Sequence, residues 1–333
     1  MAMAPLLLVA LACGLDRLVG DPRALIHPVV VVGWLITRLR GWAERWAANQ
    51  PWKLRLAGCA ITALLVSGSA LAGWGVERLA WSSPLGAALL VIALASALAG
   101  RSLEQAVLEV LQALPDLPQA RQRLSWIVGR DTEELQSAEI LRAAAETASE
   151  NAVDGLFAPL FWMLCGAGLW GLGWEGGPGP LALAWAFKAA STLDSMLGYR
   201  RGTLTWLGSA GARLDDLLVW LPCRLVALSL PLVAGRGGRC WQLLQHALAD
   251  GRPDPSPNAG VSQAAYAHAV GVELGGDNRY GAELRSKPLL AAGCPAPDTS
   301  AVQRMLALSR RLELLWLLLA AGLGLLAQLT LQR

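Results

Sequence analysis

A group of cations, hydroxyls and a carboxylate at residues 188–201 suits the binding of a polyphosphate with Mg²⁺. The segment is Lys188-Ala-Ala-Ser-Thr-Leu-Asp194-Ser195-Met-Leu-Gly-Tyr199-Arg200-Arg. If it is helical, one side of the helix carries Lys188, Thr192, Ser195 and Tyr199. Hard oxygen ligands hold Mg²⁺, and cations neutralise phosphate charge. A polar stripe at a helix–helix contact is the alternative interpretation.

A second group contains two adjacent carboxylates beside an arginine, in the sequence Ala212-Arg213-Leu214-Asp215-Asp216. On a helix one face carries Arg213, Asp216, Trp220 and Arg224, so a charged stripe runs toward an apolar stretch. The pair of carboxylates is either a metal site or a salt-bridged helix start. Its position next to an apolar stretch favours a function.

A third group is Ser149-Glu150-Asn151-Ala152-Val153-Asp154-Gly155, where the chain enters an uncharged stretch. Carboxylates and an amide at a membrane entrance cost desolvation energy, which makes a functional role more common than elsewhere. Upstream, residues 131–134 are expected to open a helix, with Glu139, Arg142, Glu146 and Glu150 on one face. For Glu139 and Glu146 a solvated, salt-bridged face is the simpler interpretation.

Two loops add further candidates. His27, beside Asp21-Pro22, lies in an early turn, where a lone histidine is more often structural. After Asn258 the sequence predicts a small-residue helix over 261–274. The turn Gly275-Gly276-Asp277-Asn278-Arg279-Tyr280-Gly281 follows it. A glycine-rich turn with an arginine lets N–H groups and a guanidinium approach an anion.

The composition places these groups in a membrane protein. Of 333 residues, 54% are hydrophobic and only 16% are charged, against about 25% in soluble domains. The 28 basic and 25 acidic residues are too balanced for a protein whose main partner is nucleic acid. The six cysteines are widely spaced, so we interpret them as small buried hydrophobic residues.

A membrane-spanning helix needs about 20 apolar residues, and apolar segments of suitable length recur along the chain. The predicted fold is all-α and polytopic, one integral membrane domain with five or six membrane segments, at about 5–20, 56–76, 84–100, 156–174, 217–234 and 314–331. The first is a short or tilted helix, and Pro222 and Pro231 predict a kink in the fifth.

The basic residues predict the orientation of these segments. The loops at about 21–53, 101–155 and 235–311 are rich in arginine and are expected in the cytoplasm. If segments 156–174 and 217–234 both cross fully, residues 175–213 lie outside, although they carry some of the most chemically suggestive residues of the chain. A re-entrant segment, such as residues 181–197, removes this conflict.

Taken together, these groups resemble the adenosylcobinamide-phosphate synthase family of the CobD/CbiB type, membrane proteins of cobalamin biosynthesis. Five stretches match in family order: 16–28, with Asp21-Pro22 and His27-Pro28; 149–160, with Glu150-Asn151; 188–199, with Thr192-Leu193-Asp194-Ser195; 212–216; and 258–281, with Asn278-Arg279-Tyr280-Gly281. Each stretch is weak alone, but five in order are specific.

The resemblance implies ATP- and Mg²⁺-dependent amide formation. The family joins adenosylcobyric acid to (R)-1-amino-2-propanol O-2-phosphate, or to free aminopropanol, to give adenosylcobinamide phosphate. The implied partners are a corrinoid, the amino alcohol phosphate, nucleotide and the lipid bilayer, without nucleic acid. A homo-oligomer or a complex with other cobalamin-assembly enzymes is compatible with the resemblance.

The resemblance also implies roles for individual residues. Asp194, Asp215 and Asp216 are assigned to Mg²⁺, and Glu150, His27 and Asp154 to catalysis, with proton transfer by Glu150 or His27. Substrate and phosphate binding falls to Asn151, Lys188, Ser195, Tyr199, Arg200, Arg213, Asn258, Asn278, Arg279 and Tyr280. Because ATP and corrinoids are cytoplasmic, the protein is expected in the cell inner membrane with its catalytic loops inward.

Two other function classes compete with this ligase. A transporter is expected to carry its charges in the middle of the spans, whereas here they gather at span ends and in loops. A non-catalytic scaffold of a corrinoid biosynthetic complex is the third alternative. Activity of the purified chain separates the enzyme from the scaffold.

Overall fold

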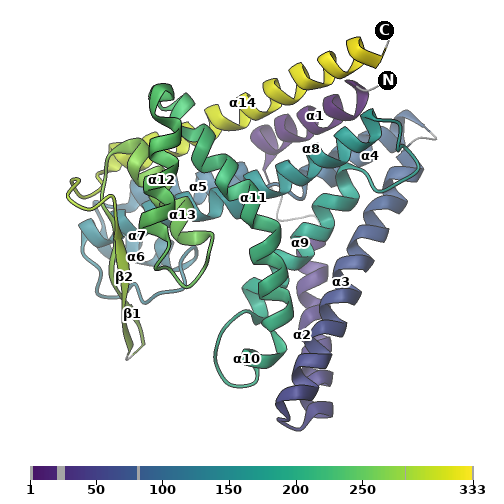
Figure 1. Ribbon diagram of the computed structural model, residues 1–333. Coiled ribbons are helices and arrows are strands. Elements are labelled where there is room, and N and C mark those ends of the chain that lie inside the picture. Colours follow the sequence, from purple (N-terminus) through teal and green to yellow (C-terminus); the bar gives the residue numbers. More distant parts are fainter. Residues whose placement is uncertain (1–2, 21–26, 81–82, 282, 332–333) are drawn as a thin grey trace. The chain divides into compact units, whose positions relative to one another are not determined.

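The computed structural model describes residues 3–20, 27–80, 83–281 and 283–331 (Figure 1). Helices account for most of them, together with one two-stranded antiparallel hairpin. The elements are α1 (Met3–Val19), α2 (Pro28–Ala47), α3 (Pro51–Ala80), α4 (Pro84–Ala95), α5 (Gly100–Ala113), α6 (Leu117–Ser125), α7 (Ser137–Ala152), the π-helical turn η1 (Val153–Phe157), α8 (Ala158–Gly171), α9 (Pro180–Leu197), α10 (Leu204–Leu207), α11 (Ser209–Val233), the 3₁₀ turn η2 (Gly237–Arg239), α12 (Cys240–Gly251), α13 (Ala259–Val270), β1 (Leu274–Tyr280), β2 (Glu283–Leu290) and α14 (Thr299–Leu331).

The prediction of an all-α polytopic membrane protein is confirmed. Among the described residues, four helical stretches are long and apolar enough to cross a membrane: α3, the continuous run from α7 through η1 to α8, α11 and α14. A fifth is obtained if α4 and α5, which meet at a 40° bend, form one broken span. Helix α1, with 17 residues, is shorter than the roughly 20 residues that a span needs, as the sequence predicted.

The chain divides into two compact units. Unit 1 contains the described residues of 1–99, 158–218 and 317–333, and unit 2 contains those of 100–157 and 219–316. The sequence analysis treated the chain as one integral membrane domain. The single integral membrane domain stays a prediction.

In unit 1 the central helix is α9, which packs against α2, α3, α4 and α8 (Figure 1). Proline at its first position suits the start of a helix. The buried Glu77 carboxylate of α3 caps this end, because it accepts hydrogen bonds from the backbone N–H groups of Gly179 (3.0 Å), Leu181 (2.7 Å) and Ala182 (3.0 Å). A carboxylate at a helix N-terminus satisfies free N–H groups and complements the helix dipole.

Unit 2 differs from the sequence analysis at two places. Residues 131–136 form a turn and not a helix start; α7 begins at Ser137, where the Glu139 carboxylate accepts a hydrogen bond from Gln136 N (2.8 Å). Asp131 instead accepts one from Gly281 N (2.6 Å), which joins this turn to the hairpin. The charge of Asp131 therefore serves the hairpin and not the dipole of α7.

The second difference is the hairpin itself. The predicted helix over 261–274 ends at Val270, and the expected glycine-rich turn is strand β1, paired with β2 from Tyr280 and Glu283 to Leu274 and Leu290. Gly275 lies in a bulge of this ladder with φ +89°, where a Cβ atom would overlap the carbonyl of Pro288. Glycine has a low β propensity, so the sequence pattern did not predict strand β1.

Candidate functional site

Unit 1 contains a pocket of about 500 Å³ with three guanidinium groups in its wall. We call it the arginine pocket and define it by Arg55, Tyr199, Arg200, Trp206, Arg213 and Asp216. These residues come from α3, the segment after α9, α10 and the start of α11. A cationic, partly aromatic pocket of this size fits an anionic ligand of nucleotide dimensions.

Local structure explains how the pocket residues converge. Helix α9 ends at Leu197, so Tyr199 lies beyond the helix and not on the face predicted with Lys188. Arg200 follows it into the pocket wall. Gly198 makes this exit possible, because a Cβ atom there would overlap the Asp194 carboxylate. The Arg55 guanidinium lies over the Trp206 ring, 4.3 Å from its centroid.

The three aspartates assigned to Mg²⁺ belong to one group. The charges of Asp194 and Asp216 both act on Asp215, as does the opposite charge of Lys188. Asp216 also lines the arginine pocket, and the Oδ1 atom of Asp215 is buried without a hydrogen-bond partner among the described residues. Within the described part of the chain, no three acidic, histidine or cysteine side chains are arranged to hold a metal ion unaided.

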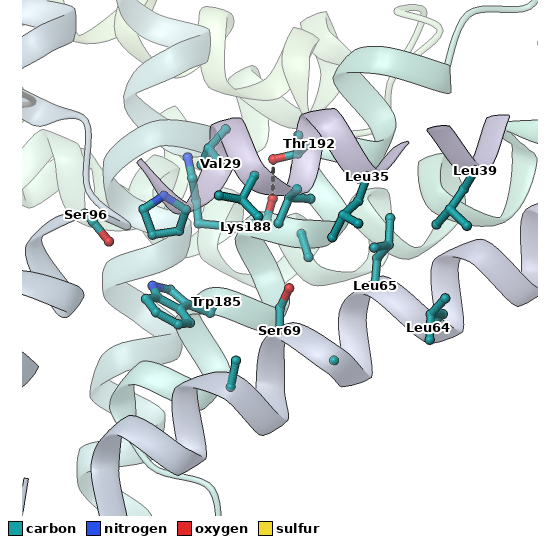
Figure 2. Close-up of a pocket in the computed structure, with 16 residues that line it drawn as sticks. Val29, Leu35, Leu39, Leu64, Leu65, Ser69, Ser96, Trp185, Lys188 and Thr192 are labelled. Atoms are coloured by element: carbon teal, nitrogen blue, oxygen red, sulfur yellow. Dashed lines mark hydrogen bonds between the residues drawn. The ribbon is translucent and has the colours of Figure 1, made fainter. Parts of the chain in front are cut away.

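Lys188 does not line the arginine pocket. It lies with Thr192 in the wall of a second, mostly apolar cavity, formed by α2, α3, α9 and Ser96 (Figure 2). Thr192 Oγ1 donates to the Lys188 carbonyl (2.6 Å), and Ser195 Oγ donates to the Thr192 carbonyl (3.0 Å). The hydroxyls of Thr192 and Ser195 are thus hydrogen-bonded to backbone carbonyls of α9.

A second polar cluster lies in unit 2 around Glu150. Its Oε2 atom accepts a hydrogen bond from the Gln263 side-chain amide (2.6 Å), and Gln263 is buried. Lys287 of β2 lies near Glu150 and forms an ion pair with Asp254 (3.8 Å). Burial acts to lower the pKa of Lys287, but the negative charges of Glu150, Asp254 and Glu146 outweigh it, so the pKa is raised. Lys287 is therefore charged at neutral pH.

Nearby, Glu146 fastens the hairpin to α7. Its carboxylate accepts hydrogen bonds from Gly275 N (3.0 Å) and from Arg130, which also binds the Asn278 side chain. Arg142 donates to the carbonyls of Gly275 (2.6 Å) and Asp277 (2.8 Å). Asn278, predicted to bind substrate, is thus part of a buried anchoring network.

The other predicted residues are spread over both units. His27 caps α2, with Nδ1 accepting from Val29 N (3.3 Å), and Asp21-Pro22 lie outside the described residues. In unit 2, Asp154 lies in η1 and Asn151 is exposed. Asn258 accepts a hydrogen bond from Arg224, Arg279 forms an exposed ion pair with Glu134 (2.7 Å), and Tyr280 lies under Arg285.

The sequence of the whole chain connects this architecture to known proteins. The family model described as CobD/Cbib protein matches residues 9–309. The chain belongs to the CobD/CbiB family. Cobalamin biosynthesis protein CobD of Synechocystis sp. is 42% identical over 322 residues, covering 95% of this chain and 91% of the relative.

Other CobD/CbiB proteins match over similar lengths. CobD of Pelobacter propionicus is 42% identical over 309 residues, covering 90% of this chain and 89% of the relative. Cobalamin biosynthesis protein CbiB of Salmonella typhimurium is 38% identical over 320 residues, 94% of this chain and 93% of the relative. No solved structure matches. The resemblance found by motif is therefore confirmed, and the CobD/CbiB family is one of cobalamin biosynthesis.

Several residues of both polar groups were missed by sequence reasoning. The residues Arg55, Lys287 and Asp254 were not among the predicted site residues. Each meets its partners through contacts far apart in the sequence, which no local spacing reveals. The available signal was weak: Lys287 is a cation in a strand-forming segment, and Arg55 stands at the entrance to an apolar helix.

Proposed function

We propose that this protein joins adenosylcobyric acid to (R)-1-amino-2-propanol O-2-phosphate, or to aminopropanol, in an ATP- and Mg²⁺-dependent amide synthesis. Family membership supports the pathway. The observation that carries the reaction type is the arginine pocket, in which three guanidinium groups lie beside the aspartate group. A reaction that uses the energy of a polyphosphate needs both features.

In this proposal the arginine pocket takes the nucleotide. Arg55, Arg200 and Arg213 bind phosphate oxygens, which guanidinium groups hold in bidentate pairs. Trp206 and Tyr199 give the same wall aromatic surface. A pocket of about 500 Å³ lies within the range of small-molecule sites.

The aspartate group fits Mg²⁺ shared with a nucleotide. Mg²⁺ is commonly bound by one or two carboxylates plus substrate phosphates and water, so three protein ligands are not required. Asp215 and Asp194 are the ligands we favour, because the Asp215 Oδ1 atom is buried without a partner in the described structure. Bound Mg²⁺ would neutralise phosphate charge. Lys188 lies in the wall of the other cavity of unit 1, so it is not retained as a ligand of the nucleotide phosphates.

The chemistry has two steps. A carboxylate oxygen of the corrinoid attacks the γ-phosphorus of ATP, ADP leaves, and an acyl phosphate forms. The amine nitrogen then attacks the acyl carbon and forms the C–N bond. The C–O bond to phosphate breaks, and phosphate leaves with its electron pair. The amine also loses one proton to a base, and Glu150 stays a prediction for that role. His27 is not retained for this step, because its Nδ1 atom caps α2.

Nucleotide binding tests the assignment of the pocket. The dissociation constant for ATP is measured with purified full-length protein in nanodiscs, for wild type, Arg213→Ala and Arg38→Ala. Arg38 lies over Trp34 outside the pocket and is the matched control. Loss of one charged hydrogen bond of about 1.5–3 kcal/mol predicts roughly 10- to 100-fold weaker binding for Arg213→Ala only. Unchanged binding by Arg213→Ala would exclude the arginine pocket.

A further inference from the structure

The second cavity of unit 1 has a volume of about 640 Å³ and a mostly apolar wall. Its lining from α2 runs from Pro28 to Leu39, and that from α3 runs from Leu64 to Ala72. At 1.5 Å per residue, the α2 side is about 16 Å long. One leaflet of a hydrocarbon core about 30 Å thick has nearly the same length.

The cation and the indole of this cavity lie toward one end, while Ser69 and Thr192 lie between the two ends (Figure 2). In Figure 2, Trp185, Lys188 and Ser96 lie at one end, whereas Leu39 and Leu64 lie at the other. The Nε1 atom of Trp185 is buried and has no hydrogen-bond partner among the described residues. A buried N–H group without a partner is destabilising, so a ligand that accepts a hydrogen bond there is favoured.

We propose that this cavity binds one membrane phospholipid, with an acyl chain along α2 and α3 and a phosphate oxygen at Lys188 and Trp185. The cation and the indole N–H are donors that suit a phosphate, and the aliphatic wall suits an acyl chain. The neighbouring α3 is a candidate membrane span, so bilayer lipid is the ligand present at highest concentration. The proposal is independent of the reaction proposed above.

A substitution at Gly68 can fill the cavity with a side chain. Gly68 lines the cavity, and a Cβ atom added there meets no atom within 4 Å, so Gly68→Phe places its ring in the acyl slot without an initial clash. Gly75 lies on the same helix and is equally open, but does not line the cavity. Gly75→Phe is therefore the matched control for helix propensity and added apolar surface.

The test measures phospholipid retained per chain after extensive detergent washing, without nucleotide or corrinoid. Wild type and Gly75→Phe are expected to retain about one phospholipid, and Gly68→Phe is expected to lose it. After complete delipidation, phosphatidylglycerol should bind roughly tenfold more tightly than diacylglycerol with the same chains, since the latter lacks the phosphate. Lys188→Met should remove this difference.

Three results would overturn the proposal. Equal lipid retention by Gly68→Phe and wild type would show that the lipid lies elsewhere. Equal affinity for phosphatidylglycerol and diacylglycerol would show that no phosphate is recognised. Displacement of the lipid by adenosylcobyric acid at stoichiometric concentration would make the cavity a substrate site. None of these readouts depends on catalytic turnover, so the lipid proposal and the ligase proposal fail separately.

Discussion

The Arg55 guanidinium carbon lies 4.3 Å from the centroid of the Trp206 ring, so a cation of α3 is held in the pocket wall by an aromatic residue of α10. A cation over an aromatic face gains about 0.5–2 kcal/mol, depending on how far it is desolvated. The stacking restricts the Arg55 side chain before any ligand arrives. Arg55 is thus oriented in advance for an anion in the arginine pocket.

Arg55 is expected to act on nucleotide affinity. Arg55→Ala should raise the KM for ATP roughly 10- to 100-fold, because one charged hydrogen bond to phosphate is lost. Arg55→Lys should restore part of the affinity for ATP, because lysine keeps the positive charge but lacks the planar guanidinium group. Arg38→Ala removes a similar cation–π contact outside the pocket and should leave the KM unchanged. Equal KM values for all variants would remove Arg55 from the site.

Asp215 offers a way to separate function from stability. Asp215→Asn keeps the size of the side chain and relieves repulsion from Asp194 and Asp216. We expect turnover to fall at least about 100-fold, while thermal stability stays equal or rises, because catalytic groups are strained for function. Raising the Mg²⁺ concentration should partly restore the rate. A variant with normal turnover would contradict the metal assignment.

The sequence analysis predicted this group because its members stand close together along the chain. Asp194 with Arg200, and Arg213 with Asp216, lie in short motifs, and the pocket brings the two motifs together. Helical periodicity failed at Tyr199, because α9 ends at Leu197, two residues before it. The hairpin was missed because the sequence Leu274–Tyr280 has turn composition, and because the side chains that anchor it, Glu146, Arg130 and Arg142, lie far away in the sequence.

The Arg130–Glu146 pair should be structural. Both side chains are buried, with exposures of 7% and 2%, and breaking a buried pair costs about 3–5 kcal/mol because one charge is left alone. Arg130→Met should therefore destabilise unit 2 strongly and increase hydrogen exchange in 274–290. Adding Glu146→Gln to it should recover part of the loss. Additive effects in this double-mutant cycle would show that the two residues are not coupled.

The charge of Lys287 should make the stability of the wild type depend on pH in the alkaline range. The raised pKa of Lys287 means that its charge stabilises the fold at every pH below the value of about 10.4 for an unfolded lysine. The stabilisation is lost as pH rises through the still higher pKa of the folded state. The difference in unfolding free energy between wild type and Lys287→Met should thus be constant near neutral pH and shrink above about pH 10.4. A difference that persists at high pH would show that packing, not charge, is responsible.

The central claim is tested most directly by the stoichiometry of the purified protein's reaction. Full-length protein in nanodiscs is given adenosylcobyric acid, (R)-1-amino-2-propanol O-2-phosphate, ATP and Mg²⁺, and the ADP and amide products are both quantified. The account predicts one ADP for each amide, no amide without ATP or Mg²⁺, and loss of both products in Asp215→Asn. Amide formation without nucleotide hydrolysis, or by Asp215→Asn at the wild-type rate, would contradict it.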